Sequence, residues 1–535
     1  MNYNVNIFVG NRFYVNQKNN IIHCSGHIFI NDEVYTNKRL ADYFSEKFTP
    51  SNIEDIINSI DGHFAIIVQF DNEIFLIVDR SRSIPLFYSI VANNIFISDK
   101  ADLINDKIFG TNDNLAISEF KLIGTCIEDK TIIKEIKQVK TGNYAQISIE
   151  NKKASFFQKE YFNYRKKKSI YSKTLTTDLL NELDNVFLKI FQQLIRFADG
   201  KKIVVPLSGG LDSRLIVYFL NRLNYKNVLC FTYGKPNNWE AKISENIAKR
   251  AGFEWKMIPY TRQMWNEYIY ATEAKSLFAF ASNLTSLPLF QDCLAIKELV
   301  SVIPKNSIFV PGISGDFLAG SHITNDLLKV NKFSRENIIN KYLLKNNISN
   351  INLRNFGAHK NLFVNSFVNI KETNSLFDFI NEFENLDYNE RQSKYIVNSC
   401  RIYEYFGYNW SLPFFFKDSL CFWKNLELDQ KIGKKLFLQY LQGRFLFENI
   451  EWTEKTPTKR DKKADNILVS NIKKTIRELR KWKKIILDYY THPMQWYGVF
   501  NNYLDYLVFS IKNYKRNTSL SLRYITFIVK RFTEQ

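Results

Sequence analysis

The sequence predicts a protein of mixed α/β and α+β class. A domain of stacked β-sheets comes first, and a domain with a parallel sheet and a helical C-terminal part follows. Over the first 160 residues, short β-branched and aromatic segments are separated by turn residues, whereas after residue 200 apolar strands alternate with helices. The 535 residues suffice for two domains and a small third one.

The strand-rich first part is divided by turn-forming pairs such as Asp71-Asn72 and Asn93-Asn94. Strands are expected at 21–30, 64–70, 74–78, 86–91 and 95–98, and short helices at 40–47 and 52–60. A polar, basic stretch at 164–173 then predicts a linker.

Beyond this stretch the apolar spacing changes to three and four residues, which indicates helices. The expected order is a helix at 175–196, a strand at 202–206, a helix ending at 222, a strand at 228–232 and a helix at 239–251. Such alternation implies a parallel sheet with crossover helices. We expect domains at 1–163 and 174–464, and a basic, aromatic helical extension at 465–535.

The net charge of +19 is compatible with several anionic partners. Basic runs such as 473–484 are usually solvated helix faces, and no nucleic-acid-binding module is recognisable. The extension is compatible with peripheral membrane contact, but a helical cap on the core is the preferred interpretation. Six scattered cysteines without a CxxC pair, no membrane-spanning apolar run and no secretory signal predict a cytoplasmic protein.

The strongest functional signal is the segment PLSGGLDSR at 206–214, between a predicted strand and a predicted helix. Backbone N–H groups at such a turn can hold an anion, and glycines let phosphates approach closely. Ser208 and Ser213 add hydroxyls, and Asp212 adds a carboxylate suited to Mg²⁺. Neither a Walker ending nor a GxGxxG fingerprint is present. The alternative is an ordinary glycine-rich turn.

This loop resembles the PP-loop, SGGxDS, of the ATP pyrophosphatases. With a strand-rich domain before it, the chain is similar to the glutamine-dependent asparagine synthetase family, which includes β-lactam synthetases and lasso-peptide cyclases. Supporting segments occur in family order at 31–35 (NDEVY), 61–65 (DGHFA), 79–88 (DRSRSIPLFY), 312–320 (GISGDFLAG), 401–418 and 452–455 (WTEK). The resemblance implies an Ntn-hydrolase-like first domain and a PP-loop (adenine nucleotide alpha hydrolase-like) synthetase domain.

The resemblance implies ATP cleavage to AMP and pyrophosphate with Asp212 and Asp316 holding Mg²⁺. Lys455 would stabilise charge as an amine attacks, with Lys459 as a rival; a lysine in a basic run is otherwise simply exposed. Asp316 and Glu240 could equally be acids of a helix start. The residues expected around the nucleotide are Leu207, Ser208, Gly209, Gly210, Asp212, Ser213 and Gly315, with the strand at 228–232 beside the adenine.

The first domain departs from the family at its start. Asn2 stands where the family's glutaminase has its catalytic cysteine, and Cys24 lies within a predicted strand. We therefore expect glutamine hydrolysis to be lost, and Asn31-Asp32 to be a remnant of a glutamine pocket.

The base that accepts the amine proton is not evident either. Ile313 and Asn409 stand where the family or its branches carry an acid, a tyrosine or a histidine. His322 and Glu404 are replacement candidates, although each fits a structural role as well.

These observations favour an ATP- and Mg²⁺-dependent carboxylate–amine ligase. Its acid would be aspartate or a sugar uronic acid of a surface polysaccharide, and its amine would be ammonia or a group on the substrate. One alternative is a lasso-peptide-type macrolactam synthetase, and another is a non-catalytic binding protein on a degraded synthetase scaffold. The resemblance leaves room for a homodimer.

Overall fold

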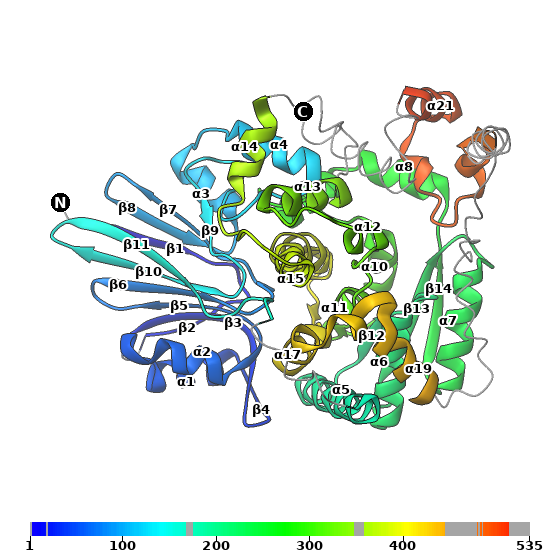
Figure 1. Ribbon diagram of the computed structural model, residues 1–535, viewed down its shortest axis with the longest axis horizontal. Helices are drawn as coiled ribbons and strands as arrows, with labels where there is room; N and C mark the ends of the chain where they lie inside the picture. The colour runs from blue at the N-terminus through cyan, green and yellow to red at the C-terminus, as the bar shows by residue number, and fades with distance from the viewer. Residues whose placement is uncertain are drawn as a thin grey trace.

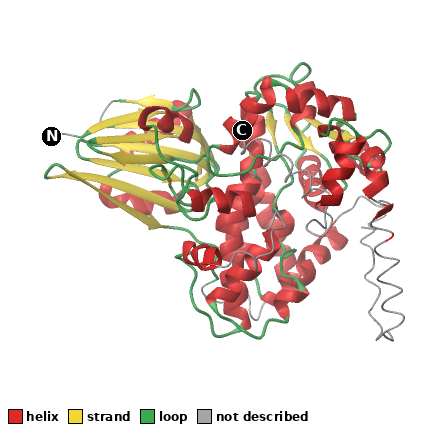
Figure 2. Ribbon diagram, turned by 90° about the horizontal axis from the view of Figure 1, so that it is seen from above, coloured by secondary structure: helices red, strands yellow, loops and turns green. Residues whose placement is uncertain are grey.

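The computed structural model describes residues 3–17, 20–166, 175–346, 358–444, 479, 482–483 and 485–512. Two packed sheets form one end of the molecule and a parallel sheet lies at the other, with helices between them (Figures 1 and 2). The predicted fold class is therefore confirmed: stacked sheets come first, and a parallel sheet with a helical C-terminal part follows.

The first part contains a four-stranded sheet in the order β1-β8-β7-β9 and a seven-stranded sheet in the order β11-β10-β6-β5-β3-β2, with β4 paired to β3. The strands are β1 (Asn4–Phe8), β2 (Tyr14–Asn16), β3 (Ile21–Ile30), β4 (Glu33–Thr36), β5 (Asp61–Gln69), β6 (Glu73–Val78), β7 (Phe87–Val91), β8 (Asn94–Ser98), β9 (Lys137–Gln138), β10 (Asn143–Glu150) and β11 (Lys153–Glu160). The helices are α1 (Asn37–Lys47), α2 (Ile53–Ser59), α3 (Ala101–Ile108) and α4 (Asn114–Ile123).

Alternating side chains of β5 build a core on each face of the larger sheet. Ala65 and Ile67 belong to the core that includes residues of the smaller sheet. Ile66 and Val68 point the other way and share a core with α1 and α2. Both faces of β5 are buried, which explains its nearly continuous apolar run.

The Asn31-Asp32 pair forms the tight turn between β3 and β4. Both residues have positive φ, 47° and 67°, as two-residue hairpin turns require. Arg196 of the following domain lies 3.2 Å from the Asp32 carboxylate. These contacts give the pair a turn role, and its origin as a remnant of a glutamine pocket stays a prediction.

The second part contains a five-stranded parallel sheet in the order β14-β13-β12-β15-β16. Its strands are β12 (Ile203–Pro206), β13 (Val228–Gly234), β14 (Glu254–Pro259), β15 (Ile308–Phe309) and β16 (Asn409–Trp410). Val204 lies opposite both Leu229 of β13 and Phe309 of β15. The loops that leave β12 and β15 therefore start side by side at the carboxyl edge of the sheet.

Helices surround this sheet and fill the rest of the described chain. They are α5 (Thr176–Ala198), α6 (Leu211–Arg222), α7 (Trp239–Arg250), α8 (Arg262–Tyr270), α9 (Thr272–Ser282), α10 (Cys293–Leu299), α11 (Gly315–Leu318), α12 (Asn325–Leu328), α13 (Arg335–Asn346), α14 (Ala358–Ser366), α15 (Leu376–Asp387), α16 (Arg401–Tyr405), α17 (Lys417–Asn425), α18 (Leu428–Lys431), α19 (Lys435–Arg444) and α21 (Tyr503–Lys512). A π-helical segment, Tyr388–Ile396, continues α15. Within the described ranges no helix is both long and apolar enough to cross a membrane.

The first three residues of the predicted linker, 164–166, pack against α15. Tyr164 is buried and its backbone N–H donates to Asn385 Oδ1 at 2.9 Å. Arg165 pairs with Glu382 at 2.7 Å, and Lys166 is buried as well. Basic composition suggested an exposed connection, but packing against α15 decides otherwise for these three residues.

Candidate functional site

The segment 207–213, called the phosphate loop below, connects β12 to α6 as predicted. The backbone N–H of Ser208 donates to Ser213 Oγ at 3.3 Å, and that of Gly210 donates to Ser208 Oγ at 3.1 Å. Ser208 and Gly210 are exposed, whereas Asp212 and Ser213 are buried. The loop thus presents exposed backbone at the N-terminus of a twelve-residue helix, where an anion is favoured.

The segment 312–320, called the acidic loop below, lies directly against the phosphate loop. The backbone N–H of Asp316 donates to Asp212 Oδ2 at 2.8 Å. A Cβ at Gly315 would lie 2.7 Å from Asp212 Cγ, so only glycine allows this approach. The structure therefore brings Asp212 together with Gly315 and Asp316, which stand about a hundred positions later in the chain.

The two carboxylates fit a divalent cation. Burial and the nearby charge of Asp316 raise the pKa of Asp212 to about 7. Asp316 is exposed and accepts from Ser321 Oγ at 2.9 Å. The described residues hold no cluster of three or more metal-binding side chains, so phosphate oxygens would complete the coordination, as Mg²⁺ often requires.

A cation missed by the sequence reasoning lies near these acids. The positive charge of Lys434 lowers the pKa of Asp212 and so opposes the effects of burial and Asp316. Lys434 and the preceding Gly433 both have positive φ, in the kink between α18 and α19. The Gly-Lys pair was the available signal, but only the fold brings it to Asp212. The expected cation, Lys455, and its rival Lys459 lie outside the described residues.

The expected adenine side of the site is formed by β12 and β13. The Leu207 N–H donates to Phe231 O at 2.8 Å, and Thr232 Oγ1 donates to Leu207 O. Gly209 lies against the ring of Trp239, which is 60% exposed at the start of α7. Glu240 follows in the first turn of that helix, and burial raises its pKa.

Asn409 and the candidate base Glu404 lie at the other edge of the sheet. The register places Asn409 opposite Ile308, at the amino end of β15. Glu404 pairs with Arg401 and accepts from Trp410 Nε1 at 2.9 Å. Asn409 and Glu404 line a cavity of about 260 Å³ there. Both are therefore separated from the phosphate loop by the length of the strands.

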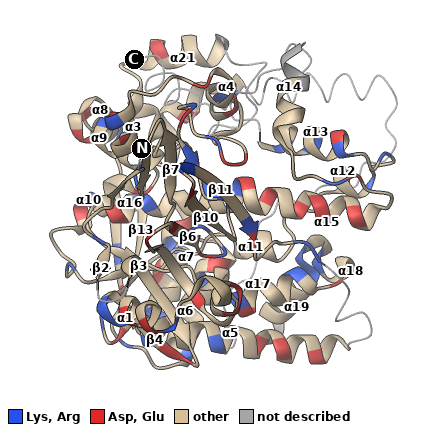
Figure 3. Ribbon diagram, turned by 90° about the vertical axis from the view of Figure 1, so that its left-hand side faces the viewer, with Lys and Arg blue, Asp and Glu red and all other residues tan. Residues whose placement is uncertain are grey.

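The other candidate base, His322, belongs to a buried group of charges behind the acidic loop. Its Nε2 lies 3.1 Å from Glu384 Oε1, and its ring packs against Phe317. Glu384 is one of the acids along α15 (Figure 3), and Lys431 Nζ donates to the same oxygen. Burial alone would raise the pKa of Glu384, but Lys431 and His322 lower it to about 2. This geometry supports a structural role for His322. Ile313 is half-buried and offers no titratable group.

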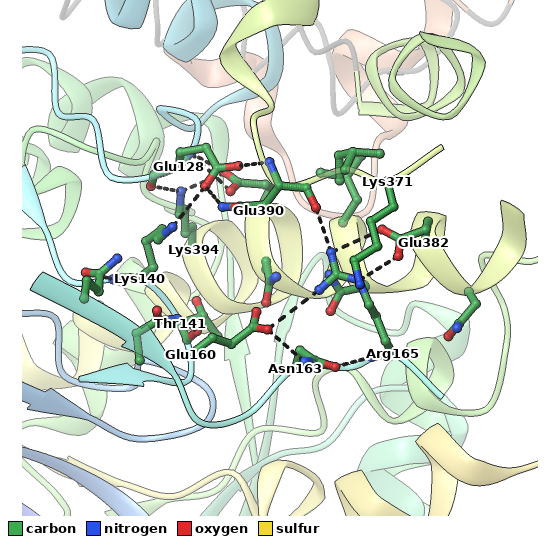
Figure 4. A pocket seen from close by; sticks show the side chains of 18 of the residues that line it. Glu128, Lys140, Thr141, Glu160, Asn163, Arg165, Lys371, Glu382, Glu390 and Lys394 are labelled. Carbon is green, nitrogen blue, oxygen red and sulfur yellow. Dashed lines mark hydrogen bonds and ion pairs between the residues drawn. The ribbon is translucent and has the colours of Figure 1, made fainter. Parts of the chain in front are cut away.

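A larger polar cavity, about 610 Å³, lies between β10–β11, residues 163–166 and α15 (Figure 4). Ion pairs line it: Arg165 pairs with Glu382 at 2.7 Å, and Lys394 pairs at 2.7 Å with Glu390 of the same π-helical segment. Because the Arg165–Glu382 pair joins residues 163–166 to α15 beside this cavity, the cavity is a seam between the two parts of the chain.

The thiol of Cys24 is unsuited to glutamine hydrolysis. Cys24 is fully buried in β3, and its Sγ donates to Asn37 O at 3.6 Å. Burial and the charge of Asp42 raise the pKa of this thiol to about 12, so it remains protonated at neutral pH.

Comparison with known proteins places residues 195–288 in the asparagine synthase family model. Over 214 residues the chain is 26% identical to the microcin J25-processing protein McjC of Escherichia coli; the alignment covers 39% of this chain and 37% of that relative. The predicted resemblance to the asparagine synthetase family is confirmed by these matches.

Among solved structures, the NH3-dependent NAD synthetase of Campylobacter jejuni matches 28% of this chain and 61% of its own at 17% identity, with a TM-score of 0.19. The glutamine phosphoribosylpyrophosphate amidotransferase of B. subtilis matches 56% of each chain at 8% identity, with a TM-score of 0.18. Likenesses of this size carry no functional argument.

Proposed function

We propose that this chain, which carries an asparagine synthase domain, is an ATP-dependent ligase that adenylates a carboxylate, releases pyrophosphate and joins the acyl group to an amine. Adenylation turns the carboxylate oxygen into a good leaving group, and amine attack on the carbonyl carbon expels AMP. The acid is aspartate or a sugar uronic acid in the first version of this proposal.

One observation carries the proposal: the Asp212 carboxylate accepts from the Asp316 backbone N–H beside the exposed residues Ser208 and Gly210 at the start of α6. That arrangement supports a triphosphate site, since backbone donors suit phosphate oxygens and paired carboxylates suit Mg²⁺. When bound, Mg²⁺ would neutralise charge on the leaving pyrophosphate. Lys434 supplies a further positive charge on the same side, which favours negative charge building up there.

The amine comes without help from a glutaminase in this chain. Buried, protonated Cys24 supports this part of the proposal. The donor is then ammonia or an amine on the substrate.

The test is exchange of labelled pyrophosphate into ATP by the full chain, with candidate acids added one at a time. We expect exchange that depends on one acid and on Mg²⁺, and its loss in Asp212→Asn, which keeps the side-chain shape and an acceptor for the Asp316 N–H. Asp178→Asn, an exposed acid on α5, is the matched control. Exchange that survives unchanged in Asp212→Asn would contradict the proposal.

A peptide carboxylate is the second candidate acid. The match to a protein named for microcin J25 processing favours it, although the aligned part is 37% of that relative. Under this version the amine lies on the same peptide and the product is a macrolactam. Mass spectrometry separates the versions, because intramolecular closure removes one water from the peptide and adds no nitrogen, whereas amidation by ammonia adds one.

A further inference from the structure

The C-terminal segment, residues 485–512, reaches the carboxyl edge of the parallel sheet. The backbone N–H of Lys235, just after β13, donates to Pro493 O at 2.5 Å. The Sδ of Met494 lies 3.4 Å from the position that a Cβ on Gly234 would take. Met494 therefore lies at the end of β13, one strand away from the phosphate loop.

The segment is fixed in this place by α8, which it covers (Figure 1). Trp265 Nε1 donates to Met494 O at 2.9 Å, and Asn266 Nδ2 donates to Gly498 O at 3.1 Å. A Cβ at Gly498 would lie 2.0 Å from Arg262 O, so the two backbones touch. The guanidinium of Arg262 also lies over the ring of Tyr489 at 4.7 Å.

The surroundings of the phosphate loop indicate where a nucleoside would lie. On the β15 side, Gly315 and Asp316 of the acidic loop occupy the space next to Asp212. On the other side β13 runs about 5 Å away, the usual spacing of neighbouring strands. A nucleotide whose phosphates are held by the loop would extend its base away from the acidic loop, toward the end of β13. A thioether is polarizable and packs well against aromatic rings.

We propose that Pro493 and Met494 form the base-side wall of the nucleotide site, with the Met494 side chain in contact with the purine. The inference rests on the proposed function, because it assumes that ATP binds the phosphate loop. Under this inference the segment 485–512, which belongs to the expected helical cap, takes part in nucleotide binding.

The test compares two ligands by calorimetry with the full chain and Mg²⁺: α,β-methylene-ATP, and inorganic pyrophosphate, which has no base. In Met494→Ala we expect the analogue to bind about tenfold more weakly, the equivalent of about 55 Å² of apolar contact, while pyrophosphate binds as in the wild type. Met494→Leu should keep most of the affinity because it retains an apolar side chain of similar size.

Two variants, Gly498→Ala and Asn266→Ala, test the docking itself. Gly498→Ala should detach the segment and weaken the analogue at least as much as Met494→Ala. Gly252→Ala is the control for a general loss of stability, because its positive φ, 70°, strains an alanine while open space around it leaves the segment untouched. Asn266→Ala, which removes only the hydrogen bonds to the segment, should give a smaller loss in the same direction and serves if Gly498→Ala does not fold.

The outcomes separate the inference from the proposed function. A wild-type chain that binds neither ligand overturns the proposed function, and the inference with it. Wild-type affinity for the analogue in both Met494→Ala and Gly498→Ala overturns the inference alone. Equal weakening of both ligands also overturns it, since the segment would then only support the fold. The same variants are also sedimented with anionic vesicles. If Gly498→Ala no longer co-sediments as the wild type does, while its affinity for the analogue is unchanged, the segment binds a membrane and the inference is overturned.

Discussion

Replacing Glu384 by glutamine tests whether the buried charges behind the acidic loop stabilise the domain. Glu384 and Lys431 are both almost fully buried, and Lys431 donates to Glu384 Oε1. Glutamine keeps the shape but leaves the lysine without its counter-charge. Breaking a buried pair in this way typically costs about 3–5 kcal/mol.

The pKa of Glu384 gives an independent estimate of this stabilisation and the direction in which it changes with pH. A folded pKa of about 2 against an ordinary 4.5 corresponds to about 3 kcal/mol in favour of the folded state. Because the folded pKa is the lower one, this stabilisation is complete above the unfolded pKa and is lost as pH falls toward 2. At pH 3 about 2 kcal/mol of it should be gone.

The assay is urea unfolding of wild type and Glu384→Gln at pH 7 and pH 3, followed by tryptophan fluorescence. We expect the variant to lose about 3 kcal/mol at pH 7 and clearly less at pH 3. Glu245→Gln, which breaks an exposed pair with Lys249 on α7, should cost under about 0.5 kcal/mol at both. A loss below about 1 kcal/mol at pH 7, or one independent of pH, would refute the reasoning.

Three further predictions concern the site. Lys434→Met should lower pyrophosphate exchange about 10²-fold, because a charge near Asp212 is lost, and equal rates would remove Lys434 from the site. Gly315→Ala should reduce exchange by about 10²-fold, since its Cβ would displace the Asp212 carboxylate; circular dichroism checks that the variant folds. Incubation with glutamine should release no glutamate above a blank, and Cys24→Ser should change nothing; enzyme-dependent release would contradict the loss of glutaminase activity.

Local sequence patterns were sufficient for several elements of both parts. The strand expected at 21–30 is β3 to the residue, and the helix expected at 239–251 is α7, which ends at Arg250. Side-chain period and turn residues act over a few positions, so one chain segment contains the whole signal. The same holds for the phosphate loop, whose residue types, glycines and place between strand and helix lie within nine positions.

Such patterns could not predict which residues far apart in the chain lie close together in the fold. Nothing in the sequence near Asn409 and Glu404 shows that β16 runs beside β15 with these residues at the amino edge, away from the phosphate loop. Likewise, the sequence does not distinguish Lys434 from the other lysines of this basic chain. Only the kink before α19 places its charge near Asp212.

The sequence by itself determined the fold class, the order of the domains and a phosphate-binding turn, because strand period, helix period and glycine-rich turns are local properties. Only the tertiary structure decided which charges meet. It set Asp316 against Asp212, buried Glu384 with Lys431 and carried Met494 to the end of β13. The physical reason is that pairing of parallel strands and packing of distant helices depend on the burial of surfaces contributed by the whole chain.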